Sequence, residues 1–196
     1  MQNLALFDFD GTLTTKDTFL EVIKHYRGNL QFWWGMLLLS PFLVAFKLKL
    51  MPNWRAKEMV ISWFFKNEEY RAFQAACTRF CDEKVGALIK PEALEAFKKH
   101  LANGDRVVVV SASAEDWVKP WCQAQGVECI ATRLAVQDGK LTGKLLGANC
   151  YGPEKVNRVN LLLNLTEYDK VYAYGDSGGD KEMLALAHHP FYRKYV

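Results

Sequence analysis

Residues 4–14, LALFDFDGTLT, give the strongest indication of how this chain folds. The apolar start of the segment predicts a buried strand, which runs into Asp8, Asp10 and Gly11. Side chains two residues apart on a strand point to the same face, so the two carboxylates meet at one point. Such a pair suits phosphoryl transfer: Asp8 would be the nucleophile, and Asp10 would protonate the leaving oxygen and then deprotonate water. The competing interpretation is a capped turn or an incidental acidic loop.

A second strand is predicted within residues 106–113, RVVVVSAS, because their β-branched run is typical of strands buried in a parallel sheet. Ser111 ends this run, and its hydroxyl would donate to a phosphoryl oxygen. Ser113 starts the sequence Ser-Ala-Glu-Asp, which fits a capping box at the beginning of a helix. We therefore assign Ser113 to the helix cap and Ser111 to the chemistry.

Two further polar sites follow in the sequence. Lys155 comes directly after Tyr-Gly-Pro-Glu and would stabilise the charge of a phosphoryl transition state, although a lone lysine is more often a surface residue. Residues 169–180, DKVYAYGDSGGD, form another predicted strand that runs into a glycine-rich acidic loop. Asp176 and Asp180 in this loop would complete an octahedral Mg²⁺ site, since that ion prefers oxygen ligands and retained waters.

These four elements, in this order, resemble the haloacid dehalogenase-like phosphohydrolases, and within them the phosphoserine-phosphatase-like branch, subfamily IB. The resemblance covers nearly the whole chain. It implies a phospho-aspartate mechanism that depends on Mg²⁺, with Asp8 and Asp10 as the catalytic residues. Thr12, Ser111 and Lys155 would bind the phosphate, and Asp8, the Asp10 carbonyl and Asp176 would bind the metal. Asp180 would orient Asp176 or a metal-bound water.

Two positions in these motifs help to distinguish between activities within this family. Haloalkanoate dehalogenases lack the second aspartate of the first motif, so Asp10 favours a phosphatase. Phosphoserine phosphatases usually carry Asn before the last aspartate of the fourth motif, where this chain has Gly179. A contact on the phosphate side is therefore lost, which puts phosphoserine in doubt as the substrate.

The order of predicted elements indicates an α/β fold, a doubly wound parallel sheet with an inserted helical cap domain. Residues 1–14 and 87–196 would form the catalytic core, and residues 15–86 a cap that closes over the site and excludes water. The candidate residues lie at the C-terminal ends of strands, where open α/β sheets bind ligands. In the core we expect a helix from Pro91 to Asn103, strands at 106–110, 127–131 and 170–174, a hairpin turn at 137–140, and helices at 114–125, 155–163 and 181–187.

Asp17, at the start of the predicted cap, has two interpretations. The resemblance to phosphoserine phosphatases assigns it to recognition of a substrate amino group. The local sequence assigns it to the cap of a helix that begins at Thr18. Both interpretations stay open on the sequence alone.

Residues 32–46, FWWGMLLLSPFLVAF, form an unusually apolar segment of 15 residues within the predicted cap. A transmembrane helix needs roughly 20 residues, and Ser40-Pro41 would break this segment, so we do not expect a single span. One interpretation is a buried helical hairpin. The other is a membrane-contacting hairpin, similar to an apolar stretch in some phosphatidylglycerophosphate phosphatases of this branch, with Trp33 and Trp34 at the interface and basic residues near anionic head groups: Lys47, Lys49, Arg55 and Lys57.

The composition of the chain indicates the cellular compartment and the partners that we expect. The chain has 196 residues, 50% of them apolar, and a net charge of +3, without a basic stripe or a nucleic-acid-binding motif. We therefore expect no nucleic-acid partner. The five cysteines show no CxxC spacing, and the N-terminal apolar run contains acids and lacks a basic leader. We expect a cytoplasmic protein, with contact to the inner face of the membrane through 32–46 left open.

The sequence thus predicts a Mg²⁺-dependent phosphomonoester hydrolase that acts on a small or lipid phosphate monoester through a phospho-aspartate. A phosphotransferase or mutase with the same intermediate is one alternative. A non-catalytic membrane-associated binding protein is the other, and the intact motif residues speak against it.

Overall fold

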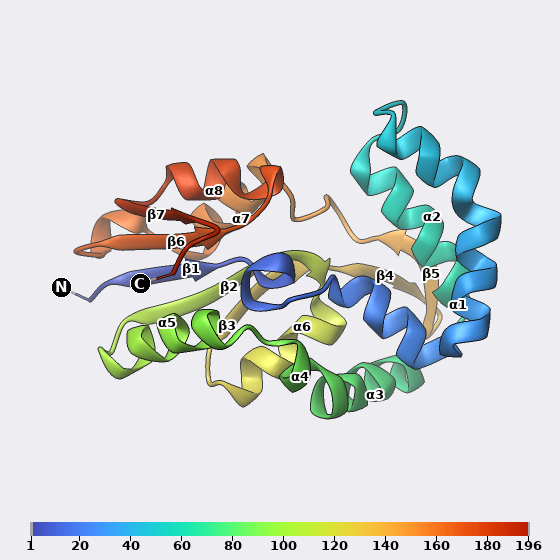
Figure 1. The fold of residues 1–196 in the computed structure, drawn as a ribbon, viewed down its shortest axis with the longest axis horizontal. Coiled ribbons are helices and arrows are strands. Elements are labelled where there is room, and N and C mark those ends of the chain that lie inside the picture. The colour runs from blue at the N-terminus through green and yellow to red at the C-terminus, as the bar shows by residue number, and fades with distance from the viewer. Residues whose placement is uncertain (1, 196) are drawn as a thin grey trace.

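The computed structural model describes residues 2–195, and its centre is a sheet of five parallel strands (Figure 1). The strands lie in the order β3-β2-β1-β6-β7. Along the chain, β2 and β3 are added on one side of β1, and β6 and β7 on the other. The winding direction of the sheet therefore changes at β1. The predicted doubly wound α/β fold is confirmed. The strand bounds are β1 (Leu4–Phe7), β2 (Arg106–Ala114), β3 (Glu128–Thr132), β6 (Val171–Gly175) and β7 (His189–Tyr192).

Helices cover both faces of this sheet. On one face lie α5 (Pro91–Ala102) and α6 (Glu115–Ala124), and on the other α7 (Pro153–Leu162) and α8 (Lys181–Ala185) (Figure 1). In β1, Ala5 and Phe7 belong to the core under α5 and α6, whereas Leu4 and Leu6 belong to the core under α7 and α8. Successive strand residues point to opposite faces, so a strand covered on both faces is apolar throughout.

Most core elements lie within a few residues of their predicted positions. The α5 helix ends before Gly104, whose φ of 75° glycine adopts without strain. The hairpin of β4 (Leu134–Gln137) and β5 (Lys140–Leu145) turns at Asp138 and Gly139, both with the positive φ of a tight hairpin turn. The sequence does not predict β7, because Pro190 lies within it. An edge strand is where a sheet tolerates proline.

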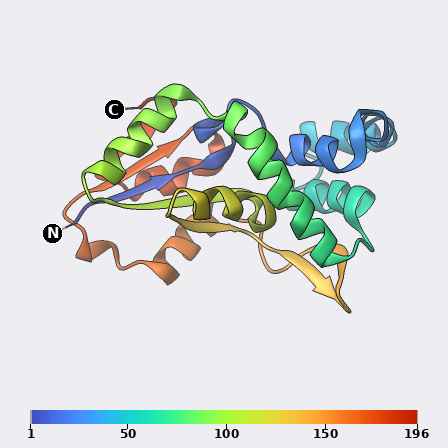
Figure 2. The same cartoon turned by 90° about the horizontal axis from the view of Figure 1, so that it is seen from below.

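Between β1 and α5 the chain forms the expected helical insertion. Figure 2 shows its first two helices at the end of the sheet opposite the chain ends. The α2 helix packs against α1 and the β4–β5 hairpin, and α3 packs against α6. The division into a cap of 15–86 and a core of 1–14 and 87–196 stays a prediction. After the short η1 (Phe9–Leu13), the insertion contains α1 (Thr18–Lys47), α2 (Asn53–Phe65), α3 (Tyr70–Phe80), η2 (Cys81–Val85) and α4 (Gly86–Leu88).

The α1 helix bends at Gly28, whose φ is 77°, and then continues without interruption to Lys47. The predicted break at Ser40-Pro41 is therefore wrong. Proline at position 41 lacks the N–H that would bond the Leu37 carbonyl, and the Ser40 hydroxyl donates to that carbonyl instead across 2.7 Å. The turn between the two arms of the hairpin comes after Lys47, before α2.

The two sides of α1 differ in exposure although both are apolar. Phe32, Gly35 and Leu39 are buried, and Gly35 lets α2 approach, since a Cβ there would lie 2.4 Å from Phe64 Cζ. The opposite side, which we call the outer face of α1, is exposed, so the interpretation of a fully buried hairpin is wrong. Among residues 2–195, α1 is the one helix long and apolar enough to cross a membrane by length and composition. The outer face consists of Leu30, Trp33, Trp34, Leu37, Leu38, Phe42 and Val44.

Candidate active site

Asp8 and Lys155 form a buried ion pair at the C-terminal end of β1. Asp8 follows the last residue of β1, and Lys155 lies in the first turn of α7. Lys155 Nζ lies 2.6 Å from Asp8 Oδ1. It also donates to Asp180 Oδ1 across 2.6 Å and to the Val110 carbonyl across 2.7 Å. These bonds use all three ammonium protons, so Lys155 is a fixed charge of the site and not a surface lysine.

Asp180 is held from two sides. Lys155 binds one carboxylate oxygen, and the other accepts the Ser177 hydroxyl across 2.7 Å, the Ser177 N–H across 3.0 Å and the Asp176 N–H across 3.3 Å. The short η4 (Gly178–Asp180) produces this arrangement, because Ser177 and Asp180 form a reciprocal capping box. Asp180 thus holds the backbone of the loop that carries Asp176.

The Asp10 carboxylate is bonded to both the insertion and the sheet. The N–H and the hydroxyl of Thr18 each donate to Oδ1 across 2.6 Å, and the Ser113 hydroxyl donates to Oδ2 across 2.5 Å. The assignment of Ser113 to a helix cap is therefore wrong. The cap position of α6 is Ala114, which makes no side-chain capping bond. The β2 strand continues beyond Val110 to Ala114, and Ser113 belongs to the strand.

Thr12 and Ser111, expected to bind phosphoryl oxygens, are buried beside the catalytic loops. Thr12 Oγ1 lies 3.1 Å from Asp8 Oδ2 and 3.5 Å from Asp176 Oδ1, between the two carboxylates. Ser111 Oγ accepts the Ser113 N–H across 3.0 Å and, as an acceptor there, keeps its own proton for another partner. Of these two serines, Ser113 lines the cavity that opens onto Asp8, and Ser111 does not.

Three carboxylates lie close enough to share a cation. One oxygen each from Asp8, Asp176 and Asp180 lies within 4.8 Å of the others. Gly11 makes room for them, because its φ is 79° and a Cβ there would lie 2.4 Å from Asp176 Oδ2. The Asp180 carboxylate accepts four hydrogen bonds, against two at Asp8 and one at Asp176, which leaves Asp8 and Asp176 as the better ligands. Carboxylate oxygens are the donors that Mg²⁺ prefers, so the residues fit this ion.

The charges of the site are incompletely balanced. Burial raises the pKa of Asp8 to about 7 against the opposing effect of Lys155, and Asp180 and Asp10 add to the rise. Burial and Asp180 also raise the pKa of Asp176. Burial alone would raise the pKa of Asp180 as well, but Lys155 holds it below its usual range. One ammonium serves several acids, so a further cation beside Asp8 and Asp176 would favour their ionised forms.

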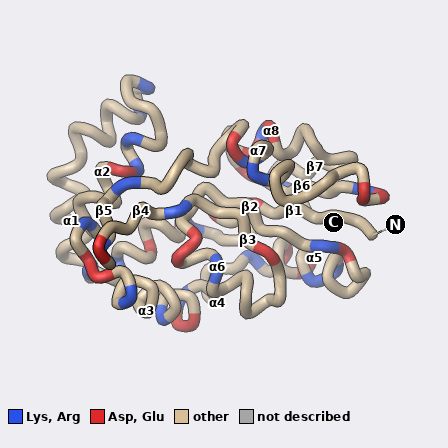
Figure 3. Tube along the Cα trace, turned by 180° about the vertical axis from the view of Figure 1, so that it is seen from behind, with Lys and Arg blue, Asp and Glu red and all other residues tan. Residues whose placement is uncertain are grey.

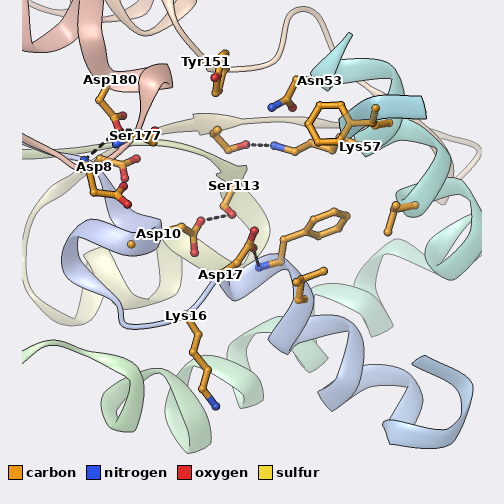
Figure 4. Close-up of a pocket in the computed structure, with 18 of the residues that line it drawn as sticks. Asp8, Asp10, Lys16, Asp17, Asn53, Lys57, Ser113, Tyr151, Ser177 and Asp180 are labelled. Carbon is orange, nitrogen blue, oxygen red and sulfur yellow. Dashed lines mark hydrogen bonds between the residues drawn. The ribbon is translucent and has the colours of Figure 1, made fainter. Parts of the chain in front are cut away.

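A cavity of about 460 Å³ opens onto these residues and is lined by both the core and the insertion. Figure 4 shows Asp8, Ser177 and Asp180 on one side of it and Asn53 and Lys57 on the other. The cavity is large enough for a small-molecule ligand. The apolar side chains of its wall come mainly from the insertion: Phe19, Leu20, Met36, Leu43, Phe46, Ala56 and Val60.

Asp17 caps α1 and also lines this cavity, so its two interpretations do not exclude each other. Its Oδ1 accepts the Phe19 N–H across 2.9 Å. Burial raises the pKa of Asp17 to about 6, and the charge of Asp10 contributes.

Lys57 is a cavity residue that the sequence places elsewhere. Its Nζ reaches from α2 to the sheet and donates to the Ala112 carbonyl across 2.7 Å and to Asn149 Oδ1 across 3.0 Å. The expectation that Lys57 lies near lipid head groups is therefore wrong. Nothing in the local sequence marks it, because its position depends on how α2 packs beside the end of β2.

Residues outside the four motifs also hold the loops that carry Asp8, Asp10 and Asp176. The Tyr195 hydroxyl donates to the Thr12 carbonyl across 2.7 Å, and Arg193 Nε donates to the Asp176 carbonyl across 2.9 Å. Lys90 Nζ donates to the carbonyl of Gly11. These contacts join residues up to 183 positions apart, and no strand-end pattern in the sequence indicates them.

Gly179, where phosphoserine phosphatases usually carry Asn, has a structural reason in this chain. A Cβ at Gly179 would lie 2.3 Å from Tyr151 Cε2. The ring of Tyr151 therefore occupies the space that a larger residue would need, and Tyr151 lines the cavity. The departure from the motif changes the shape of the substrate cavity at this point.

A doubly wound sheet with an acid pair after β1, a buried lysine and an acidic loop after β6 defines a class of α/β hydrolases that act on phosphate esters. A family model, haloacid dehalogenase-like hydrolase, matches residues 5–185. The chain belongs to this family, and it is an enzyme, a phosphatase of the haloacid dehalogenase-like type.

Individual relatives agree with this assignment. The protein CicA of Caulobacter vibrioides is 33% identical over 192 residues, which cover 97% of this chain and 85% of CicA. A histidinol-phosphatase of Neisseria meningitidis is 27% identical and covers 97% of this chain and 89% of its own length. Among solved structures, a phospho-aspartyl intermediate analogue of phosphoserine phosphatase has a TM-score of 0.66 at 23% identity, over 95% of this chain and 83% of that one. The last likeness shows the fold.

Proposed function

We propose that this chain is a Mg²⁺-dependent phosphomonoester hydrolase that works through a phospho-aspartate at Asp8. The observation that carries the proposal is the buried arrangement of Asp8, Lys155 and Asp180, in which the ammonium lies 2.6 Å from each carboxylate. A carboxylate fixed at a strand end beside a permanent positive charge is suited to attack phosphorus and to tolerate the charge of the phosphoryl group. The solved phosphoserine phosphatase with a phospho-aspartyl analogue supports the same intermediate here.

The chemistry would use two displacements. An oxygen of Asp8 attacks phosphorus, the bond to the leaving oxygen breaks, and Asp10 gives its proton to that oxygen. The same Asp10 carboxylate then takes a proton from water, whose oxygen attacks phosphorus, so that phosphate leaves and Asp8 is restored. Lys155, Ser111 and Thr12 would hold the phosphoryl oxygens during both steps.

For the metal we propose Asp8, Asp176 and the Asp10 carbonyl as ligands, with Asp180 holding the Asp176 loop from behind. Bound Mg²⁺ supplies positive charge that stabilises the transferred phosphoryl group. The pKa of Asp8, raised to about 7, and the raised pKa of Asp176 support a cation here, because a nearby positive charge favours the ionised form of both acids.

The decisive experiment replaces the two aspartates of the first motif. Asp8→Asn should abolish turnover of p-nitrophenyl phosphate while the melting temperature shows a folded protein, since the change removes little more than a charge. Asp10→Asn should slow turnover but still allow phospho-enzyme to form from esters with activated leaving groups. Full activity of Asp8→Asn would refute the mechanism.

A phosphotransferase or mutase would use the same intermediate and pass the phosphoryl group to a second substrate. Release of phosphate and alcohol in equal amounts, with no new ester when alcohols are added, would support the hydrolase. We also propose a cytoplasmic location, supported by free thiols at all five cysteines. The non-catalytic alternative is set aside, because the chain is an enzyme.

We further propose that residues 32–46 make peripheral contact with the inner face of the membrane. Trp33 and Trp34 are 66% and 62% exposed, which supports the membrane-contacting interpretation of this segment. Aromatic and aliphatic side chains on one face of a helix, with lysines nearby, are typical of helices that lie in a membrane interface. Flotation of the purified protein with anionic vesicles tests this contact, and absence of flotation would contradict it.

A further inference from the structure

The cavity above Asp8 has two chemically different parts. Its catalytic part is lined by carboxylates, hydroxyls and an ammonium, which suit a phosphoryl group. The other part comes from the insertion. Asp17, Asn53 and Lys57 line it, but its larger share is an apolar wall to which Met36, Leu43 and Phe46 of α1 and Val60 of α2 contribute. Polar groups placed against such a wall would lose hydration without gaining partners. The wall therefore indicates a leaving group with an apolar chain.

The apolar wall continues into the outer face of α1. Met36, Leu43 and Phe46 are half-buried and line the cavity, while Trp34, Leu37 and the other outer-face residues of the same helix are exposed. A surface helix of a globular protein normally carries polar residues on its outer side. A helix that is apolar all round is expected where both of its sides meet apolar groups, so one side would meet the substrate chain and the other a lipid phase.

The charge around the outer face suits an anionic surface. Residues 29–66 contain five basic side chains and one acidic one, a net charge of +4, whereas the whole chain carries +3. Figure 3 shows basic residues at the tip of the α1–α2 hairpin, while the outer arm of α1 is largely uncharged. Lys47 and Lys49 at this tip are exposed. Anionic head groups attract basic residues placed at the edge of an apolar face.

We infer that the substrate is a lipid phosphate, an amphiphilic phosphate monoester taken from an anionic bilayer on which the outer face of α1 rests. The inference depends on the proposed phosphatase function. The phosphate reaches Asp8, and the first part of the chain lies against Met36, Leu43 and Phe46. A cavity of about 460 Å³ holds the phosphate and the first part of the chain but not a whole lipid, so the rest of the chain continues along α1 toward the bilayer. Hydrolysis breaks the bond to phosphorus, leaving the lipid alcohol in the bilayer and releasing phosphate to water.

The first test uses n-butyl, n-octyl and n-dodecyl phosphate, kept monomeric, which differ only in chain length. We expect kcat/KM to rise by at least about tenfold from butyl to dodecyl, because each methylene buried against the wall adds to binding. Equal kcat/KM across the series, with phosphate still released, would overturn the inference and leave the phosphatase intact. No release from any ester by the folded, Mg²⁺-supplied protein would instead refute the proposed function.

Variants of the wall locate the effect. Leu43→Asn introduces an amide into the wall and should lower the dodecyl-to-butyl ratio toward one. Leu161→Asn makes the same change at an 87% exposed position on α7 and should keep the parent ratio. Met36→Gln serves as the wall variant if Leu43→Asn does not fold. A ratio that stays at the parent value in a folded wall variant would contradict the assignment of the wall.

The second test identifies the surface. Phosphatidic acid at a low, equal fraction is presented in phosphatidylglycerol vesicles or in phosphatidylcholine vesicles. We expect faster hydrolysis in the anionic vesicles, and Trp34→Ala should lower vesicle turnover more than turnover of monomeric octyl phosphate. If vesicle charge has no effect and sedimentation shows a dimer that Trp34→Ala dissociates, the outer face binds a second copy of the chain and the membrane part of the inference is wrong.

Discussion

The Ser113 hydroxyl donates a hydrogen bond of 2.5 Å to Asp10 Oδ2. Thr18, the first residue of α1, binds the other oxygen of the same carboxylate through its N–H and its hydroxyl. The proposed acid and base is therefore oriented jointly by the end of β2 and by the start of the insertion. A movement of α1 relative to the sheet would change the orientation of Asp10, which connects the position of the insertion with proton transfer.

Ser113→Ala should slow the hydrolysis of esters with poor leaving groups. The change frees one oxygen of Asp10 while the Thr18 bonds remain, so we expect a fall in kcat of about tenfold, below the full 10²–10⁴ contribution of general acid–base catalysis. The loss should be smaller for p-nitrophenyl phosphate, whose leaving group needs no proton. Ser113→Thr keeps the hydroxyl and should restore most of the rate. Equal losses for both kinds of ester would argue against orientation of Asp10 by Ser113.

The meeting of the three candidate carboxylates could be predicted because parallel strands deliver their C-terminal ends to one edge of the sheet. Asp8, Asp176 and Asp180 follow β1 and β6, which are neighbours in the sheet, and Lys155 reaches them from the next helix. Such residues are marked in the sequence by an apolar run that ends in a polar group. Their position depends on local strand pattern and sheet order alone.

Other residues depend on packing that no local pattern records. Lys57 reaches Ala112 only because α2 lies beside the end of β2, and Tyr195 reaches Thr12 from the far end of the chain. The predicted break at Ser40-Pro41 fails for a different reason. A side-chain hydroxyl satisfies the carbonyl that proline leaves without a donor, so the usual rule for proline in helices does not hold there.

Chelation of divalent metal should stop hydrolysis, and Mg²⁺ should restore it. Mn²⁺ should substitute in part, whereas Ca²⁺ prefers more ligands and longer bonds and should not support in-line transfer. Asp176→Asn should raise the Mg²⁺ concentration needed for half-maximal activity, because it removes one anionic ligand. Undiminished activity in excess EDTA, with removal of metal verified, would count against a metal site at Asp176.

Two aromatic substitutions should separate the outer face of α1 from the core. Phe65 is fully buried between α1 and α3 partners, with Phe73 at a ring distance of 4.9 Å, so Phe65→Ala should cost about 3–5 kcal/mol in the free energy of unfolding. Trp34 is 62% exposed, and Trp34→Ala should change that free energy by no more than about 0.5 kcal/mol. Urea unfolding of both variants makes the comparison. A large loss for Trp34→Ala would mean that this side chain is part of a packed interior.

The contribution of Lys57 to the stability of the fold should rise with pH between about 8 and 10.5. Burial lowers the pKa of Lys57 from 10.5 to about 8, partly opposed by the charges of Asp10 and Asp17, while the positive charge of Lys155 favours the lowering. Cys150 also faces this lysine and opposes the shift. In this pH range the unfolded chain holds a proton on Lys57 that the folded chain has released. The equilibrium therefore moves toward the folded state as the pH rises, and below about pH 8 both states hold the proton.

Lys57→Met should remove this part of the pH dependence. Urea unfolding at several values across the range gives the slope of the unfolding free energy against pH for the parent and the variant. Lys98→Met, at an exposed position on α5, is the matched control and should keep the parent slope. The slope is the informative quantity, because loss of the bonds to Ala112 and Asn149 shifts the whole curve of the variant by a constant amount. Equal slopes for the parent and Lys57→Met would show that Lys57 keeps its proton in the folded protein.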